Sequence, residues 1–382
     1  MNPYKPTLFE RILSFGARLL GRLPGRVQAL IAFLLTGRRR RVIEGKKLDP
    51  CSHLMITISK QRSPYGLCEP EPVAARARFQ KEILTFQGTK TEVGKVCDLE
   101  IAGEKIPGEK ERRRLPARLY TPDTPAPEGG RRLLVFFHGG GFVIGDIESH
   151  DEPCRLLCKH ADTLVLSVEY GLAPERKHPH PVEDALAAFD SARERASEFG
   201  ADPKRVSVGG DSAGGNLSAV VAQQRRRDEN PPSAQLLIYP ATDGSERSDS
   251  YQSRKLYCEG LAITQADYEA FGRHYVEGSG VERDNERVSP LCAPDFKGLP
   301  PALVVVAGFD LLRDDGEKYF DEMKKAAVKE RGQPAADRDF ELMRFATLAH
   351  GFLHMTGVCP STRKATIKIA LKWRELLDNT GR

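Results

Sequence analysis

The sequence predicts an α/β fold with a mostly parallel central sheet and helices on both faces. Three observations lead to this prediction. Nearly continuous apolar runs alternate with segments of helical periodicity along most of the chain. The β-branched run 206–208 passes through glycines into a helix of small residues. Asp310 and His350 each follow a later apolar run, at the strand ends where sites of parallel sheets form.

The composition supports a large folded core and excludes nucleic acid as a partner. The chain has 382 residues, of which 40% are hydrophobic. Its net charge is only +5, from 58 basic and 53 acidic residues. The basic runs 38–41, 112–114 and 225–227 accompany no recognition motif, so we expect them to be solvated faces rather than nucleic-acid contacts.

The eight cysteines are scattered without the dense spacing of a disulfide scaffold. We therefore expect reduced thiols. Cys154 and Cys158 share one helix face, but a second ligand pair is missing, so we interpret them as buried core residues rather than metal ligands. No metal and no cofactor is predicted.

The N-terminal region predicts two helices. Residues 8–20 have apolar side chains at helical spacing with arginines between them, and the apolar run 27–35 is too short to cross a bilayer. No small-residue cleavage site follows, so a cytoplasmic location is expected. The two helices are interpreted as packing elements of an N-terminal cap, with peripheral contact to membrane or lipid as the alternative.

Apolar runs of strand length predict the strands of the sheet. Residues 97–101 and 115–120 are typical of outer strands, whereas 131–137 form an apolar run typical of a strand covered on both faces. Glycine caps a predicted helix at 181–199. The further strands are predicted at 164–168, 206–208, 235–240, 302–307 and 340–345.

His138, Gly139, Gly140 and Gly141 directly follow the buried strand 131–137. Consecutive glycines leave backbone N–H groups open, as an oxyanion hole or a phosphate-binding loop requires. No Gly-Lys-Ser/Thr pattern follows, and a serine turn lies downstream. The sequence therefore favours an oxyanion hole.

Ser212 lies in the sequence Gly210-Asp211-Ser212-Ala213-Gly214, between a strand and a helix. Glycines on both sides allow the strand and helix to approach closely, and the sharp turn exposes the hydroxyl. The alternative interpretation is a tight strand-to-helix junction with no catalytic role. As a nucleophile, Ser212 needs a base, an orienting acid and oxyanion donors.

Asp310 and His350 are the candidates for the acid and the base. Asp310 follows the strand 302–307, whereas its competitors Asp314 and Asp315 are interpreted as helix N-terminal charges. His350 follows the last strand and precedes a glycine. The alternative base, His354, is expected in the following helix.

Taken together, the motifs resemble the hormone-sensitive-lipase-like family of α/β-hydrolase carboxylesterases. The resemblance covers residues 115–374 and includes 170–175, where glycine replaces the family's arginine at position 171. Its four main motifs appear in one order: His138-Gly139-Gly140-Gly141, Gly210-Asp211-Ser212-Ala213-Gly214, residues 310–314, and His350-Gly351-Phe352.

The resemblance implies an α/β-hydrolase fold with a helical cap, and it implies the role of each motif residue. Ser212 matches the nucleophile, Asp310 the acid and His350 the base. The motif positions that complete the implied site are the oxyanion donors Gly140, Gly141 and Ala213, with His138, Gly139 and Asp211 in support.

The implied organisation is a helical cap or extension over residues 1–80 and a catalytic domain over 81–382, with a cap insertion at about 243–294. The implied activity is hydrolysis of short- to medium-chain acyl esters, with a small-molecule ester as substrate. An arylamide amidase or deacetylase is the alternative, and a non-catalytic receptor on the same scaffold is disfavoured because His350 is present. A homodimer is left open.

Overall fold

The central sheet is mostly parallel, as predicted. The computed structural model describes residues 8–62, 65–69, 71–108, 110–259, 261–331 and 339–380. Within them, β3 pairs antiparallel with β4 and β4 pairs antiparallel with β6, at one edge of the sheet. The six strands β5 to β10 all run parallel to one another. The strand order is β10-β9-β8-β7-β5-β6-β4-β3. The bounds are β3 (Lys95–Ala102), β4 (Arg114–Thr121), β5 (Arg131–Phe137), β6 (Leu164–Val168), β7 (Ala201–Asp211), β8 (Gln235–Ile238), β9 (Ala302–Phe309) and β10 (Phe340–Ala349).

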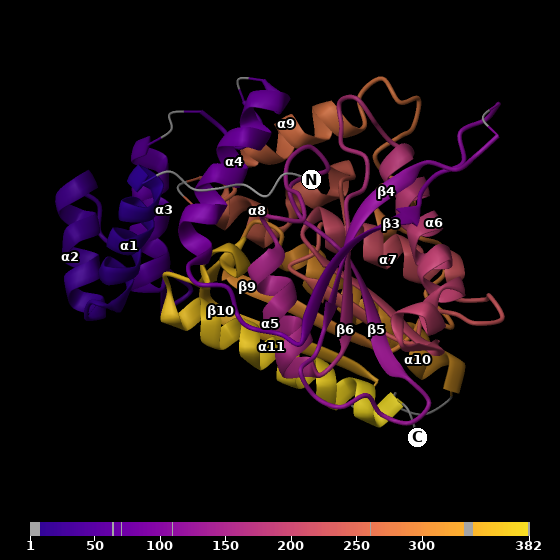
Figure 1. Cartoon of the computed structure of the whole chain (residues 1–382). Helices are drawn as coiled ribbons and strands as arrows, with labels where there is room; N and C mark the ends of the chain where they lie inside the picture. Colours follow the sequence, from indigo (N-terminus) through magenta and orange to yellow (C-terminus); the bar gives the residue numbers. More distant parts are fainter. Residues whose placement is uncertain are drawn as a thin grey trace.

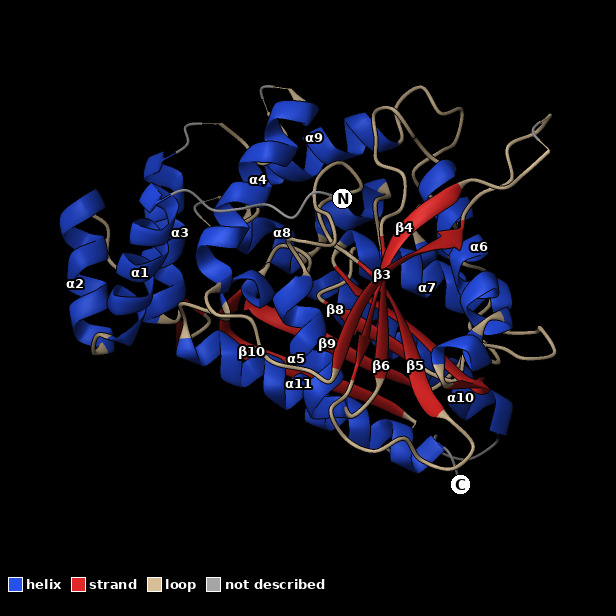
Figure 2. Ribbon diagram, viewed as in Figure 1, coloured by secondary structure: helices blue, strands red, loops and turns tan. Residues whose placement is uncertain are grey.

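Helices cover both faces of the sheet, because its inner strands are apolar on both sides (Figure 2). Leu134 and Phe136 of β5 contribute to the core under α5 (Asp151–Ala161) and α11 (Pro360–Thr380). Leu133, Val135 and Phe137 contribute to the core on the opposite face of the sheet. That core contains α6 (His180–Glu194), α7 (Ala213–Arg225) and α10 (Arg313–Arg331).

The helix predicted at 181–199 is in fact two elements. α6 ends at Glu194, and the 3₁₀ helix η1 (Ala196–Phe199) follows. The final turn tightens before Gly200, which has a φ of 77° and donates its N–H to Ser197 and Ala196 carbonyls. The predicted glycine cap is confirmed, with a break in the helix before it.

The N-terminal segment is helical and lies at one end of the molecule (Figure 1, indigo). The two helices predicted there are present, and no helix among the described residues is long and apolar enough to cross a membrane. The elements before the main sheet are α1 (Leu8–Arg22), α2 (Gly25–Thr36), β1 (Val42–Ile43), β2 (Lys46–Lys47), α3 (Pro50–Arg62) and α4 (Pro72–Gln87).

The segment between β8 and β9 is also helical, and it meets the N-terminal helices above the sheet (Figure 1). Thr264 caps α9 with a capping box closed by Asp267. Asp267 also accepts the N–H of Leu67 at 2.7 Å, so this helix start is tied to the segment before α4. The elements are η2 (Glu246–Ser250), α8 (Gln252–Tyr257), α9 (Gln265–Tyr275) and η3 (Pro290–Cys292).

The cysteines differ in part from the expectation. Cys154 and Cys158 are buried in the core, as predicted. Cys51 and Cys359 form a disulfide with their Cα atoms 5.6 Å apart, so the expectation of reduced thiols is wrong for this pair. The sequence separation of 308 residues hid the pairing, because only the packing of α3 beside the start of α11 brings the two together.

Candidate active site

Ser212 lies at a strained turn between β7 and α7. Its φ of 53° and ψ of −116° are rarely adopted by a residue with a side chain. Its N–H donates to the carbonyl of Ile238 at 2.9 Å, which holds the turn. A methyl group at Gly210 or Gly214 would overlap the carbonyl of Phe137, so both flanking glycines are sterically required.

The structure brings Ser212, His350 and Asp310 together. The Oγ of Ser212 lies 3.0 Å from Nε2 of His350, and Nδ1 of His350 lies 2.7 Å from Oδ2 of Asp310. Oδ1 of Asp310 accepts the N–H of Leu312 at 2.8 Å, which fixes the carboxylate. Asp310 is 1% exposed and His350 is 9% exposed, so solvent competes little for these hydrogen bonds.

The competing acids have other partners. Asp314 accepts the N–H of Ser253 at 3.0 Å, and buried Asp315 pairs with Arg254 at 3.0 Å. Both carboxylates belong to the first turn of α10, as expected for helix N-terminal charges. Asp310 is therefore the carboxylate that reaches His350.

Gly139, Gly140 and Gly141 form a loop beside Ser212. The N–H of Gly139 donates to Oδ1 of Asp211 at 2.8 Å, which anchors the loop to the residue before Ser212. Gly140 has a φ of 119°, and a methyl group there would overlap the carbonyl of Ile144. Ala213 is the first residue of α7, so its N–H has no carbonyl partner within the helix.

His138 supports this loop rather than the triad. Its ring stacks on Tyr170 with the ring centroids 4.4 Å apart, and Nδ1 lies 2.8 Å from the carbonyl oxygen of Gly139. The hydroxyl of Tyr170 donates to the His138 carbonyl at 2.7 Å. Burial lowers the pKa of His138 to about 4, so the ring is neutral near pH 7.

Two further histidines lie against Asp211: His150, which the sequence did not single out, and His354, which it offered as the alternative base. Burial lowers the pKa of His150, but the neighbouring Asp211 carboxylate outweighs it and leaves the pKa above its ordinary value. Burial would raise the pKa of Asp211, yet His150 holds it well below its usual range. Burial and His150 lower the pKa of His354 to about 3. Among the described residues, these three form a group of potential metal ligands.

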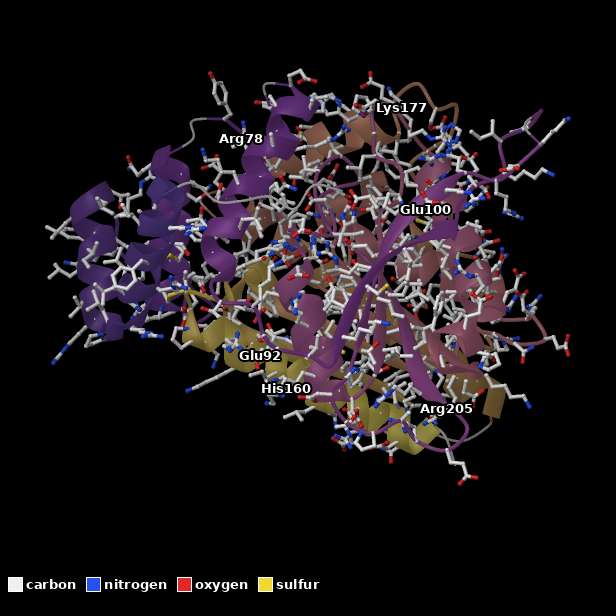
Figure 3. The ribbon with its side chains drawn as sticks, in the orientation of Figure 1. Arg78, Glu92, Glu100, His160, Lys177 and Arg205 are labelled. Atoms are coloured by element: carbon white, nitrogen blue, oxygen red, sulfur yellow. A yellow bond between two sulfur atoms is a disulfide. The ribbon has the colours of Figure 1, made fainter. Side chains whose placement is uncertain are left out.

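A cavity of about 500 Å³ opens onto Ser212 and His350. Apolar side chains from three helices line much of it: Ile56 of α3, Phe79, Ile83 and Phe86 of α4, and Phe271 of α9. Arg78 of α4, labelled in Figure 3, also lines this cavity and donates to the carbonyl of Glu69 at 2.6 Å.

A smaller cavity of about 70 Å³ also reaches Ser212 and is lined by Phe142, Tyr275 and Leu312. Phe271 borders both cavities. A methyl group on Gly141 would overlap the Phe271 ring, so the glycine loop packs directly beneath α9. The sequence contained no signal for the lining residues of α3 and α4, because the segment that holds them is polar and interrupted by glycine and proline.

The fold and the geometry around Ser212 define an α/β hydrolase. Residues 134–354 match the family model described as alpha/beta hydrolase fold, and the chain belongs to this family. This match, together with esterase relatives such as LipN and EstE1, confirms the resemblance to hormone-sensitive-lipase-like esterases.

The relatives are named as esterases. The carboxylic ester hydrolase LipN of Mycobacterium tuberculosis is 40% identical over 351 residues, which cover 90% of this chain and 86% of LipN. The carboxylesterase NlhH of the same organism is 35% identical, over 66% of this chain and 75% of NlhH. This chain is likewise a carboxylic ester hydrolase.

Solved structures agree with this assignment. The ester hydrolase EH1AB1 from the metagenome of Lake Arreo has a TM-score of 0.75 and 34% identity, over 88% of this chain and all of its own. The carboxylesterase EstE1 from a metagenomic library has a TM-score of 0.69 and 35% identity, over 81% of this chain and 98% of its own.

Proposed function

We propose that Ser212 is the nucleophile of a two-step acyl transfer. The observation that carries the proposal is the continuous hydrogen-bonded chain from Ser212 through His350 to Asp310, with bonds of 3.0 and 2.7 Å. His350 accepts the Ser212 proton at Nε2 while Asp310 accepts a hydrogen bond from Nδ1 and holds the ring in that tautomer.

The glycine loop and the helix start supply the oxyanion donors. The N–H groups of Gly140, Gly141 and Ala213 surround the position where the carbonyl oxygen of the ester becomes negatively charged. His350 then returns its proton to the leaving alcohol, and water hydrolyses the acyl-enzyme by the same route in reverse order. The residues 1–80 and 243–294 act as the cap over this site.

The two unequal cavities support a substrate class. We propose that the cavity of about 500 Å³ holds the longer part of a short- to medium-chain ester, whereas the cavity of about 70 Å³ accommodates a small group. A series of p-nitrophenyl esters from acetate to hexadecanoate, with matched anilides, tests this. A kcat/KM maximum between butanoate and octanoate is expected. Preference for the anilides or for hexadecanoate would contradict the proposal.

Covalent labelling tests the nucleophile separately. A p-nitrophenyl phosphonate should add a single adduct to the intact protein, and peptide mapping should locate it on Ser212. The variant Ser212→Ala should remain unlabelled and should lose hydrolysis by about 10⁶-fold. An adduct on another residue, or wild-type turnover by the variant, would overturn the assignment.

We further propose that the outer face of α1 contacts a lipid surface. Ile12, Phe15 and Leu19 share this face and are 60%, 64% and 58% exposed. Arginines Arg11, Arg18 and Arg22 lie on the same helix. Exposed apolar side chains beside cations suit the surface of a membrane that contains anionic lipids.

Vesicle co-sedimentation tests this contact. The protein should sediment with vesicles of phosphatidylcholine and phosphatidylglycerol, and the double change Phe15→Glu and Leu19→Glu should abolish this. Val328→Glu, at another exposed apolar position, is the control and should sediment normally. Absence of binding by the wild type would overturn the proposal. So would self-association that the double change removes, because it would assign the face to a second copy of the chain.

A further inference from the structure

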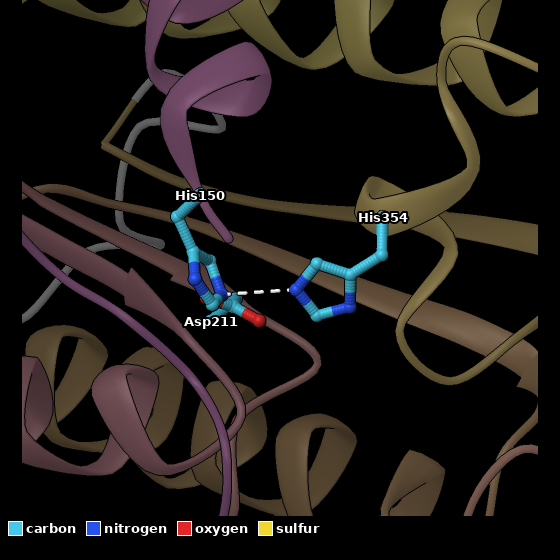
Figure 4. A group of neighbouring side chains, drawn as sticks. All are labelled: His150, Asp211 and His354. Atoms are coloured by element: carbon cyan, nitrogen blue, oxygen red, sulfur yellow. Dashed lines mark hydrogen bonds and ion pairs between the residues drawn. The ribbon is translucent and has the colours of Figure 1, made fainter. Parts of the chain in front are cut away.

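The side chains of His150, Asp211 and His354 lie close together (Figure 4), next to Ser212 in the case of Asp211. Nε2 of His150 lies 3.0 Å from Nε2 of His354 and 3.2 Å from Oδ1 of Asp211. The three side chains are at most 9% exposed. They come from three separate segments: the residue before α5, the end of β7, and η4 (Phe352–Met355).

The spacing of these atoms suits a metal ion. Ligands at about 2.1 Å from one ion lie about 3.0 Å apart when their bonds are at right angles, as in octahedral coordination. The Nε2–Nε2 separation of 3.0 Å and the Nε2–Oδ1 separation of 3.2 Å are of this size. Two imidazoles and one carboxylate on one side of an ion form the facial ligand set of non-haem iron sites, and imidazole also suits zinc and nickel.

The surroundings of His150 prepare it for this role. Its Nδ1 lies 3.0 Å from Oγ of Ser149 and 3.2 Å from the carbonyl oxygen of Asp146. The hydroxyl of Ser149 donates to that same carbonyl at 2.8 Å, so both neighbours of Nδ1 act as acceptors and Nδ1 carries the proton. In the neutral ring, Nε2 therefore presents a lone pair, which accepts the N–H of Gly139 at 3.3 Å. A bound ion would take the place of this contact, and the N–H would keep Oδ1 of Asp211 at 2.8 Å as its acceptor. Metal-bound histidines are held in this way, with the other ring N–H bonded to a backbone carbonyl or similar acceptor.

An entry path also exists. Asp211 and His354 both line the cavity of about 500 Å³ that reaches Ser212, so an ion would arrive through the substrate cavity. We propose that His150, Asp211 and His354 bind a divalent first-row transition metal ion, in a site separate from the Ser212, His350 and Asp310 constellation.

The site would act as a clamp between segments that position the hydrolytic residues. Asp211 precedes Ser212 and accepts the N–H of Gly139, and His354 follows His350 by four residues. An ion bound by both would join the serine turn, the glycine loop and the turn after β10. This inference does not depend on the identity of the ester, because metal binding is measured without substrate.

The first experiment titrates cobalt into the full-length protein after treatment with a chelator. Visible ligand-field absorption should grow and saturate at a single equivalent, and the thermal unfolding midpoint should rise with cobalt concentration. His354→Leu should lose the absorption and the shift. The control His160→Leu lies at the far end of α5 from His150 and should keep both (Figure 3). No saturable binding by the wild type, or unchanged binding by His354→Leu, would overturn the proposal.

The second experiment needs no variant and decides the matter if His354→Leu fails to fold. Crystals of the wild-type protein soaked with cobalt should give an anomalous peak within about 2.1 Å of both Nε2 atoms. A peak elsewhere, or no peak, would show that the three residues form a hydrogen-bonded cluster only, and would overturn the site.

Discussion

His350 lies within hydrogen-bonding distance of Ser212, 3.0 Å from Nε2 to Oγ, although 138 positions separate the two residues. Ser212 follows β7 and His350 follows β10, and strands β8 and β9 lie between them in the sheet. Because these strands are parallel, their carboxyl ends lie on one edge, and the loops that leave them meet there.

Replacing Asp310 should disturb the orientation and tautomer of His350 while leaving the serine and histidine that exchange the proton in place. In Asp310→Asn, the amide no longer favours the tautomer of His350 that accepts the serine proton, so kcat should fall by about 10⁴-fold while KM changes little. Asp314→Asn is the control, because that carboxylate accepts a backbone N–H of Ser253 and does not reach His350. Steady-state kinetics with p-nitrophenyl butanoate measures both. Equal losses in the two variants would contradict the assignment of Asp310.

A methyl group in the glycine loop should remove oxyanion stabilisation. In Gly140→Ala, the new Cβ would overlap the carbonyl of Ile144 at a φ of 119°, so the loop must move. Loss of an oxyanion donor typically costs about 3 kcal/mol, so kcat should fall at least about 100-fold. Gly16→Ala, which places its methyl in open space within α1, should leave kcat unchanged. Near-wild-type kcat for Gly140→Ala would exclude this loop as the oxyanion hole.

The large cavity should set the acyl-length limit. In Ile83→Phe, a larger side chain enters the cavity from α4, so kcat/KM for octanoate should fall by about 10-fold or more while acetate is hydrolysed as before. Val73→Phe places the same side chain on the exposed part of α4 and serves as the control. Equal effects on acetate and octanoate would show that the acyl chain lies elsewhere.

Glu169 should make stability depend on pH. Its carboxylate accepts the N–H of Ile147 at 3.0 Å, and desolvation raises its pKa from 4.5 to about 7, with Asp146, Glu148 and His150 as charged neighbours. The folded state therefore binds more protons than the unfolded state between these two pKa values. The contribution of Glu169 to the free energy of unfolding is therefore greatest below pH 4.5 and declines as the pH rises to about 7.

Glu169→Gln should flatten this dependence, because the amide keeps an acceptor for Ile147 and has no charge to bury. Urea unfolding at pH 5 and pH 8 should show the variant losing less stability at pH 8 than the wild type, by on the order of 1 kcal/mol. Glu198→Gln, an exposed acid paired with Arg195, is the control. If the free energy of unfolding fell more steeply from pH 5 to pH 8 in Glu169→Gln than in the wild type, the upward direction assigned to the pKa of Glu169 would be wrong.

Several features of this protein were determined by the sequence alone. The buried strands are recognisable because their apolar runs are covered on both faces, as in β5 and β9. The turn at Ser212 is recognisable because close approach of strand and helix requires glycine at positions 210 and 214, adjacent in sequence to the serine. The order of the motifs then identified Asp310 and His350, which the structure places in contact.

Other features were decided only by the tertiary structure. The cavity that opens onto Ser212 is lined by side chains of α3, α4 and α9, and the Cys51–Cys359 disulfide joins residues 308 apart. His150 and His354 meet Asp211 from two segments 204 positions apart. The physical reason is the same in each case. Local sequence specifies backbone geometry and burial over a few residues, whereas these contacts depend on how distant segments pack above the carboxyl edge of the sheet.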